Sequence, residues 1–156
     1  MTKILFVCHG NICRSPMAEF ILKDMVKKAG ITARFEIASA AVSTEEIGNP
    51  VYPPAKRELA KHGISCAGKT ARQITMHDVR TYDRIYYMDS SNLRFLRRMF
   101  PDDSLFGNGA SAKFFPLLPR DVADPWYTGD FETTYRDIEQ GCRGIMQSCI
   151  PDKIQI

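Results

Sequence analysis

A thiol and a guanidinium stand six residues apart near the start of the chain, at Cys8 and Arg14. A Gly-Asn turn separates them at positions 10–11, and the apolar run 4–7 comes directly before them. Backbone N–H groups in such a loop can all point inward, and a helix that begins after it adds partial positive charge. The pattern predicts a loop that binds a tetrahedral oxyanion above a nucleophilic sulfur, as in phosphoryl transfer through a cysteinyl-phosphate.

Each residue type in this loop suits that chemistry. A free cysteine such as Cys8 is often only a small buried hydrophobe, but a helix N-terminus and an arginine favour the thiolate, which attacks phosphorus. Arg14 offers two parallel N–H bonds to phosphate oxygens, a fork that lysine lacks. Gly10 permits close approach of the backbone to the anion, and Asn11 tolerates left-handed geometry.

Expulsion of an alkoxide or phenoxide requires a general acid, and we expect Asp124 to supply it. Pro125 stiffens its loop, and the side chains of Trp126 and Tyr127 could partly cover its carboxyl group. The same carboxylate could then deprotonate the water that hydrolyses the phosphoenzyme. Read alone, Asp124 would simply begin an Asp-Pro turn, and Asp121 is the alternative acid.

The other thiols and the histidines predict no metal site. Cys13 lies in the same loop as Cys8, so mild oxidation could join the two sulfurs and protect the nucleophile, unless Cys13 is only a buried loop residue. His9, His62 and His77 lie far apart in the chain, and none forms a ligand-spaced pair with a cysteine. We therefore expect no metal and no cofactor.

The elements that must position these residues alternate between strand and helix. A first helix from Ser15 would end at Gly30, with Ser15 as its N-cap and Pro16 as its first helical residue. Ser15 could instead donate its hydroxyl to the thiolate, and the sequence leaves both roles open. Alternation of this kind predicts an α/β domain with a doubly wound parallel sheet covered on both faces. The expected strands are 4–7, 35–39, 84–88 and 113–118, and the main helices are 15–29, 54–62, 90–99 and 131–149, with a further turn at 75–79.

Length and composition are those of one ordinary domain spanning 1–156. The net charge of +3 suits an anionic substrate but not a nucleic-acid surface, and the arginines at 94, 97 and 98 read as a solvated helix face. Five cysteines without regular spacing argue against a disulfide framework. The sequence shows no signal-peptide pattern and no apolar run long enough to span a membrane, so we expect a cytoplasmic protein that binds no membrane.

Five motifs along the chain form one set, namely Cys8-x5-Arg14-Ser15, residues 39–43 (SAAVS), 71–73 (ARQ), 88–93 (MDSSNL) and 124–127 (DPWY). With this set the chain resembles the low-molecular-weight protein tyrosine phosphatases over essentially its whole length. The resemblance implies a three-layer fold with a four-stranded parallel sheet, and metal-independent hydrolysis of phosphotyrosine in proteins or peptides by a monomer or weak homo-oligomer. It implies Cys8 as nucleophile, Arg14 as phosphate binder, Asp124 as acid and then base, and loop-holding hydrogen bonds among Asn11, Ser15 and Ser39. The expected substrate- and phosphate-binding residues are His9, Gly10, Asn11, Ile12, Cys13, Ser15, Trp126 and Tyr127.

Three positions depart from the family pattern. His9 replaces a small or apolar residue, so it would strengthen phosphate binding at low pH as a cation or form a pocket wall as a neutral ring. Glu45 replaces an aromatic residue, which removes one side of the slot for the phenyl ring and repels anions. Lys69 replaces a histidine of the loop-holding network, which leaves its own place in that network open. Ile12, by contrast, suits an aromatic ring better than the threonine of the phosphoarginine-directed branch.

Two other functions fit the same loop less well. A thiol-dependent arsenate reductase would need a downstream cysteine pair near residue 85, but the nearest thiols are Cys66 and Cys142. A phosphopeptide-binding module without turnover would not need Cys8, Arg14 and Asp124 together.

Overall fold

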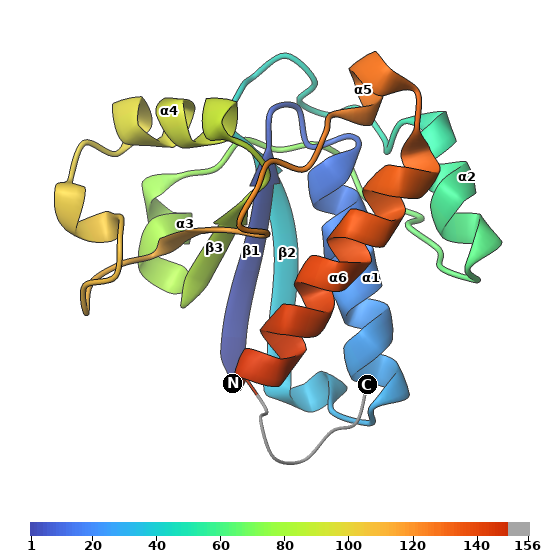
Figure 1. The fold of residues 1–156 in the computed structure, drawn as a ribbon, viewed down its shortest axis with the longest axis horizontal. Coiled ribbons are helices and arrows are strands. Elements are labelled where there is room, and N and C mark those ends of the chain that lie inside the picture. Colours follow the sequence, from blue (N-terminus) through green and yellow to red (C-terminus); the bar gives the residue numbers. More distant parts are fainter. Residues whose placement is uncertain (150–156) are drawn as a thin grey trace.

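The computed structural model describes residues 1–149 and forms three layers, a four-stranded parallel sheet between two groups of helices (Figure 1). The sheet order is β2-β1-β3-β4, and each neighbouring pair runs parallel. This confirms the predicted doubly wound α/β class. The strands are β1 (Thr2–Cys8), β2 (Phe35–Ala41), β3 (Arg84–Tyr87) and β4 (Phe114–Pro116).

Helices cover both faces of the sheet. Three pack together on one face, namely α1 (Arg14–Lys28), α2 (Pro53–Lys61) and α6 (Phe131–Cys149), while α3 (Met76–Thr81) and α4 (Ser90–Met99) cover the other. A four-residue helix, α5 (Pro125–Thr128), precedes α6, and single 3₁₀ turns lie at Thr32–Arg34 and Asp103–Leu105. None of the helices within residues 1–149 combines the length and apolar character needed to cross a membrane.

The continuous apolar run of β1 follows from its central position. Ile4 and Phe6 join the core beneath α1 and α6, whereas Leu5 and Val7 join the core beneath α4, and all four side chains are fully buried. A strand with helices on both faces needs apolar residues at every position. The strand therefore holds Cys8, its last residue, on a rigid support.

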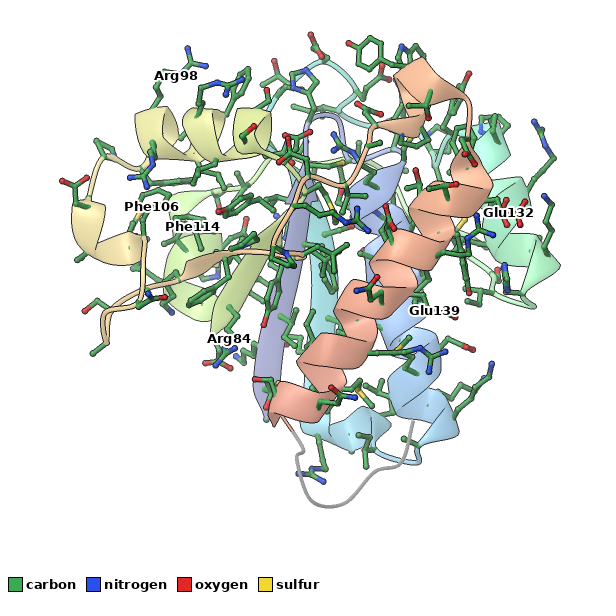
Figure 2. All side chains as sticks on the ribbon, in the orientation of Figure 1. Arg84, Arg98, Phe106, Phe114, Glu132 and Glu139 are labelled. Atoms are coloured by element: carbon green, nitrogen blue, oxygen red, sulfur yellow. The ribbon has the colours of Figure 1, made fainter. Side chains whose placement is uncertain are left out.

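The arginines of α4 are exposed, as the sequence predicts, and Figure 2 labels one of them, Arg98. The Arg97 guanidinium lies 4.4 Å from the ring centroid of Phe106, which in turn stacks on Phe114 at 5.0 Å. Arg97 therefore covers an aromatic ring of the core rather than contributing to a separate charged site.

Several predicted boundaries were wrong. Helix α1 begins at Arg14 with Cys13 as its N-cap, so Ser15 is not the N-cap and Pro16 is the third helical residue. The N–H that Pro16 lacks is still one of the four that a helix leaves unpaired, so the proline is tolerated there. The loop expected around Asp124 contains α5, and β4 is three residues long instead of six.

The carboxyl ends of β1, β2 and β3 meet at one edge of the sheet, where the loop after β1 lies (Figure 1). Ligands of open α/β sheets bind at this edge. The predicted domain of 1–156 includes residues 150–156, which lie outside the part that the structure describes.

Candidate active site

The sulfur of Cys8 lies at the base of the loop and is held by Ser15. Cys8 is buried at 3% exposure, its Sγ is 3.0 Å from Ser15 Oγ, and the Ser15 backbone N–H donates to Sγ at 3.4 Å. The Nδ2 of Asn11 donates to the same Ser15 oxygen at 2.7 Å, so the Ser15 proton is directed at the sulfur at 3.0 Å and at the more distant Ala40 carbonyl at 3.4 Å. The structure therefore favours the thiolate-donor role for Ser15 over the capping role.

Asn11 ties the loop to its surroundings. Its φ of 59° is the left-handed geometry that the sequence predicts for this position, and its side chain is 1% exposed. Nδ2 also donates to Ser39 Oγ at 2.9 Å, and Oδ1 accepts from the backbone N–H of Arg72 at 3.2 Å. The hydrogen bonds expected among Asn11, Ser15 and Ser39 are thus present.

A buried ion pair continues this network into the core. Ser39 donates through Oγ to Glu19 Oε1 at 2.6 Å, and Lys69 lies 3.6 Å from the same oxygen while donating to the Ser39 carbonyl at 2.9 Å. Burial lowers the pKa of Lys69, and the neighbouring Glu19 opposes that shift. Lys69 therefore joins the network, a question that the sequence leaves open, whereas sequence reasoning missed Glu19.

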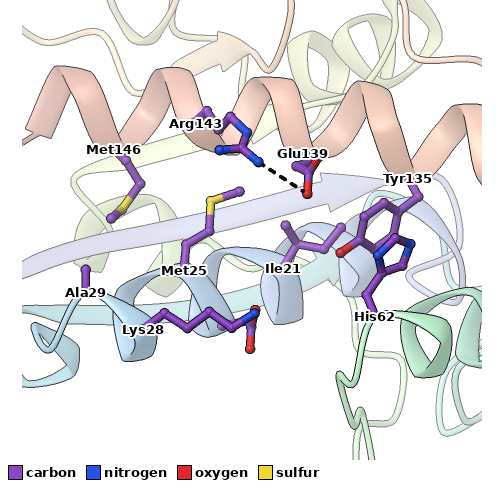
Figure 3. Close-up of a pocket in the computed structure, with 10 residues that line it drawn as sticks. Ile21, Met25, Lys28, Ala29, His62, Tyr135, Glu139, Arg143 and Met146 are labelled. Carbon is purple, nitrogen blue, oxygen red and sulfur yellow. Dashed lines mark ion pairs between the residues drawn. The ribbon is translucent and has the colours of Figure 1, made fainter. Parts of the chain in front are cut away.

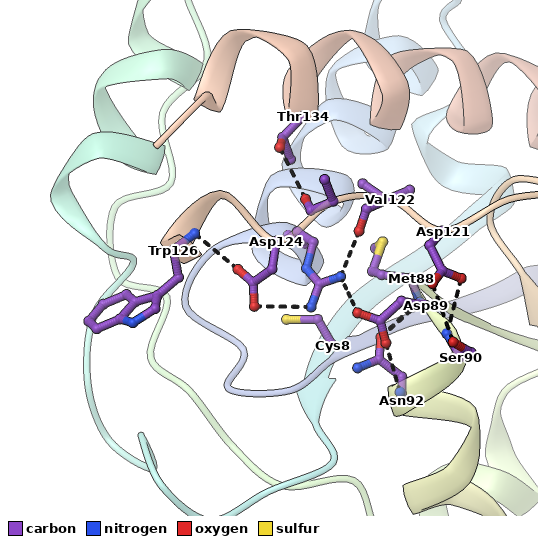
Figure 4. A network of polar contacts seen from close by, with 12 residues as sticks. Cys8, Met88, Asp89, Ser90, Asn92, Asp121, Val122, Asp124, Trp126 and Thr134 are labelled. Atoms are coloured by element: carbon purple, nitrogen blue, oxygen red, sulfur yellow. Dashed lines mark hydrogen bonds and ion pairs between the residues drawn. The ribbon is translucent and has the colours of Figure 1, made fainter. Parts of the chain in front are cut away.

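Arg14 is almost completely buried and is oriented by three partners, Asp89, Val122 and Asp124, which Figure 4 labels. Its Nη1 donates to Asp89 Oδ2 at 2.7 Å and to the Val122 carbonyl at 2.8 Å, and its Nη2 donates to Asp124 Oδ2 at 3.3 Å. Burial opposes the positive charge, but the Cys8 sulfur and the two carboxylates outweigh it and raise the pKa of Arg14. The guanidinium therefore stays charged beside the sulfur.

Asp89 belongs to a motif that carries the family resemblance, but sequence reasoning assigned it no role in the site. It lies two residues after β3, at the carboxyl edge of the sheet, and is the N-cap of α4, where it accepts from the Asn92 backbone N–H at 2.8 Å. A carboxylate at the end of a strand beside β1 could have indicated this role.

The two candidate acids occupy different places (Figure 4). Asp124 lines the cavity above Cys8, with one oxygen facing Arg14 and the other accepting from the Trp126 backbone N–H at 3.0 Å. Asp121 instead accepts from the N–H and hydroxyl of Ser90 and does not line that cavity. The structure therefore disfavours Asp121 as the acid.

A cavity of about 220 Å³ opens above the sulfur. The predicted cover over Asp124 is incomplete, because Trp126 and Tyr127 are 53% and 85% exposed and the Asp124 side chain remains 25% exposed. Trp126 packs against Tyr52, with ring centroids 4.8 Å apart. Asn11, Ser15 and Ser39 lie behind the lining instead of in it. The lining consists of Cys8, His9, Gly10, Ile12, Cys13, Arg14, Glu45, Glu46, Asp124, Trp126 and Tyr127.

His9 and Ile12, two residues of the phosphate loop, lie in different environments. His9 is 37% exposed at the mouth, where its Nε2 lies 2.5 Å from Glu45 Oε2. Ile12 is buried with Cys13 against Ala71, so only part of it reaches the cavity. Burial raises the pKa of Cys13, which therefore remains a neutral thiol beside Cys8.

Within residues 1–149, no cluster of three or more His, Cys, Asp or Glu side chains could hold a metal ion. A second hollow of about 370 Å³ lies between α1 and α6, away from Cys8 (Figure 3). Its cations are already paired, Lys28 with Asp24 and Arg143 with Glu139. The cavity above Cys8 is therefore where nucleophile, cation and carboxylate meet.

Comparison with known proteins agrees with this geometry. The family model described as low molecular weight phosphotyrosine protein phosphatase matches residues 3–154. The chain belongs to this family. It is 38% identical to the low molecular weight protein-tyrosine-phosphatase YfkJ of Bacillus subtilis over 98% of this chain and 99% of that one, and 39% identical to the human phosphatase of the family over 92% and 93%.

Solved structures of family members have the same fold. The crystal structure of YfkJ from Bacillus subtilis matches with a TM-score of 0.88 and 37% identity, covering 99% of this chain and 98% of that one. The phosphatase SP-PTP from Streptococcus pyogenes matches with a TM-score of 0.85 and 37% identity, covering 96% and 94%. These findings confirm the resemblance and the enzyme class that the sequence predicts, a protein-tyrosine phosphatase of low molecular weight.

Proposed function

We propose that the enzyme hydrolyses phosphotyrosine, an aryl phosphate monoester, in proteins or peptides through a cysteinyl-phosphate. The observation that carries the proposal is the convergence of three groups on one cavity. The buried Cys8 sulfur forms its base, the Arg14 guanidinium stands beside it, and the Asp124 carboxylate lies 3.3 Å from that guanidinium. These are a nucleophile, a binder for the phosphoryl oxygens and a proton donor.

In the first step the Cys8 thiolate attacks phosphorus and the bond from phosphorus to the tyrosyl oxygen breaks. The electron pair of that bond leaves with the oxygen, which takes a proton from Asp124. Arg14 and the backbone N–H groups that the sequence predicts to point into the loop stabilise the charge on the three equatorial oxygens.

In the second step Asp124, now a carboxylate, takes a proton from a water molecule that attacks phosphorus. The phosphorus–sulfur bond breaks, its electrons return to Cys8, and inorganic phosphate leaves. Ser15 Oγ at 3.0 Å supports the thiolate as leaving group. Each step uses side chains of one chain, and none requires a metal.

The lining supports an aromatic ester as substrate. Trp126 and Tyr127 stand exposed on one side of the mouth, where their faces can pack against a phenyl ring. An arsenate reductase on this loop has no comparable support, because Cys66 and Cys142 are buried and do not line the cavity.

The proposal is tested by comparing Asp124→Asn with the matched variant Asp121→Asn on an aryl phosphate. Loss of the general acid should lower kcat by roughly 10²–10⁴-fold, whereas Asp121→Asn should stay near the wild-type rate because its carboxylate contacts only Ser90. Cys8→Ser should abolish turnover. Wild-type rates from Asp124→Asn or Cys8→Ser would refute this mechanism. Parallel rates on phosphotyrosine, phosphoserine and phosphoarginine peptides test the substrate class.

A further inference from the structure

The mouth of the cavity has two unlike walls. One is aromatic and comes from α5, with Trp126 and Tyr127. The other is acidic and comes from the loop after β2, with Glu45 and Glu46. We refer to these two glutamates as the acidic wall. A peptide that places its phosphotyrosine in the cavity must pass its neighbouring residues across one wall or the other.

His9 fixes one member of the acidic wall. Its Nε2 contacts Glu45 Oε2, and its ring meets the edge of Phe95 in α4 with centroids 5.4 Å apart. The guanidinium of Arg98 lies over the same Phe95 ring at 4.8 Å. The His9 imidazole is therefore held between Glu45 and α4. The Glu45 side chain is still 66% exposed, so its carboxylate is both oriented and open to a ligand.

Glu46 is fixed by different contacts. Its Oε2 accepts from Asn49 Nδ2 at 2.6 Å. Its side chain also lies against the phosphate loop, since a Cβ added to Gly10 would come within 3.2 Å of Glu46 Cγ. Both glutamates are thus positioned at the mouth by residues of the loop on which they stand and of the phosphate loop itself.

The charges of this wall are not neutralised by a lysine or arginine. Across residues 1–149, neither Glu45 nor Glu46 forms an ion pair with such a side chain, and Glu45 has only His9. Arg14 is the one strong cation in the lining, and Asp89 and Asp124 already face it. A site built for a dianionic phosphate therefore carries negative charge at its entrance, which repels anionic neighbours of the phosphate and attracts cationic ones.

We propose, resting on the proposed function, that Glu45 and Glu46 select phosphotyrosine segments that carry lysine or arginine next to the phosphotyrosine. The basic side chain would pair with the acidic wall while the aromatic wall packs against the tyrosine ring. His9 serves this selection as a positioning residue, because it orients the Glu45 carboxylate toward the mouth.

The test compares kcat/KM for three phosphotyrosine peptides that differ only at the residues flanking the phosphotyrosine, which are arginine, alanine or glutamate. At low ionic strength we expect arginine to exceed alanine and alanine to exceed glutamate by about fivefold each, the effect of one close charge pair in water. We call the ratio of kcat/KM between the arginine and the glutamate peptide the spread. Glu45→Gln and Glu46→Gln should each reduce this spread, and their combination should abolish most of it. High salt should compress it as well, because exposed charges are screened.

Glu132→Gln is the matched control, since Glu132 is exposed on α6, pairs with Arg136 and does not line the cavity. It should leave the wild-type order and spread unchanged. His9→Gln should narrow the spread by releasing Glu45, with a smaller effect on the alanine peptide. Equal rates on the three peptides, or an unchanged spread in the Glu45/Glu46 double variant, would overturn the acidic wall while leaving the proposed function intact. No Cys8-dependent turnover of any peptide would overturn both.

Discussion

At the scale of single residues, the site depends on how its cation is held. Arg14 is buried, and a buried guanidinium is stable only when its charge and its N–H groups are satisfied. Asp89 and the Val122 carbonyl meet that need on Nη1 and leave Nη2 directed at Asp124. The fork that must bind phosphate is thereby oriented before substrate arrives, which is a recurrent source of catalytic power.

Asp89→Asn tests this positioning role. Removing the carboxylate releases Nη1, and a small misplacement of the guanidinium should lower kcat/KM for an aryl phosphate by about 10²-fold. Because Arg14 also binds the product, inhibition by inorganic phosphate should weaken in parallel. An asparagine at position 89 can still cap α4, so the free energy of unfolding should change little. If kcat/KM falls while the inhibition constant for phosphate stays at the wild-type value, Asp89 does not position Arg14.

At the scale of elements, α6 packs closely against the segment after β4. A Cβ built on Gly141 would lie 2.5 Å from Leu117 Cγ, in a region where both residues are buried. Gly144 lies on the same helix and is exposed, and a Cβ built on it would have no other atom within 4 Å. Close packing therefore requires glycine at position 141, whereas the packing around position 144 does not.

Alanine at these two positions should shift stability in opposite directions. Gly141→Ala overpacks the contact with Leu117 and should cost about 1–3 kcal/mol, whereas Gly144→Ala should gain up to about 1 kcal/mol from helix propensity. Thermal unfolding should show Tm changes of roughly 2–4 °C per kcal/mol for a chain of this size. A stabilised Gly141→Ala variant would contradict the close packing of α6.

The start of α3 links another element to the loop that supports Asn11. Asp78 accepts from both guanidinium nitrogens of Arg72 and from the N–H and hydroxyl of Thr75. Burial raises the pKa of Asp78, but these donors outweigh it and hold the pKa below its usual value. The backbone N–H of Arg72 is the group that bonds Asn11, so this ion pair also steadies the phosphate loop.

A depressed native pKa makes the contribution of Asp78 pH-dependent. The stabilisation is fully present above the pKa of the unfolded state, about 4, and it is lost as pH falls through the lower native pKa. The Tm of wild type should therefore exceed that of Asp78→Asn at neutral pH, and the gap should close below about pH 4. A gap that stays constant from pH 7 to pH 3 would show that the charge of Asp78 contributes nothing.

At the scale of the whole molecule, local patterns predict the loop, and the family resemblance supplies Asp124 and Ser39, which lie 110 residues from Arg14 and 28 residues from Asn11. The loop from Cys8 to Arg14 follows one strand and opens one helix, so local patterns suffice. Asp89 lies 75 residues from Arg14, and Lys69 lies 50 residues from Glu19. Such pairs arise from strand order and loop packing, which no local spacing encodes.

The predicted start of α1 is wrong for a related reason. Residue preferences favour Ser15 as an N-cap, but its hydroxyl is engaged with Asn11 and Cys8, and the helix begins one residue earlier at Arg14. A functional loop overrides a local preference there. The sheet, by contrast, follows from the burial of whole strands, and its prediction holds apart from strand lengths.

The central claim is that phosphate is transferred to the sulfur of Cys8, and rapid acid quench tests it most directly. Asp124→Asn slows hydrolysis of the intermediate, so quenching its reaction with an aryl phosphate of good leaving ability should trap the phosphoenzyme for peptide mapping by mass spectrometry. The account predicts phosphate on Cys8 and none in Cys8→Ser. Phosphate on another residue, or turnover by Cys8→Ser at the wild-type rate, would contradict it.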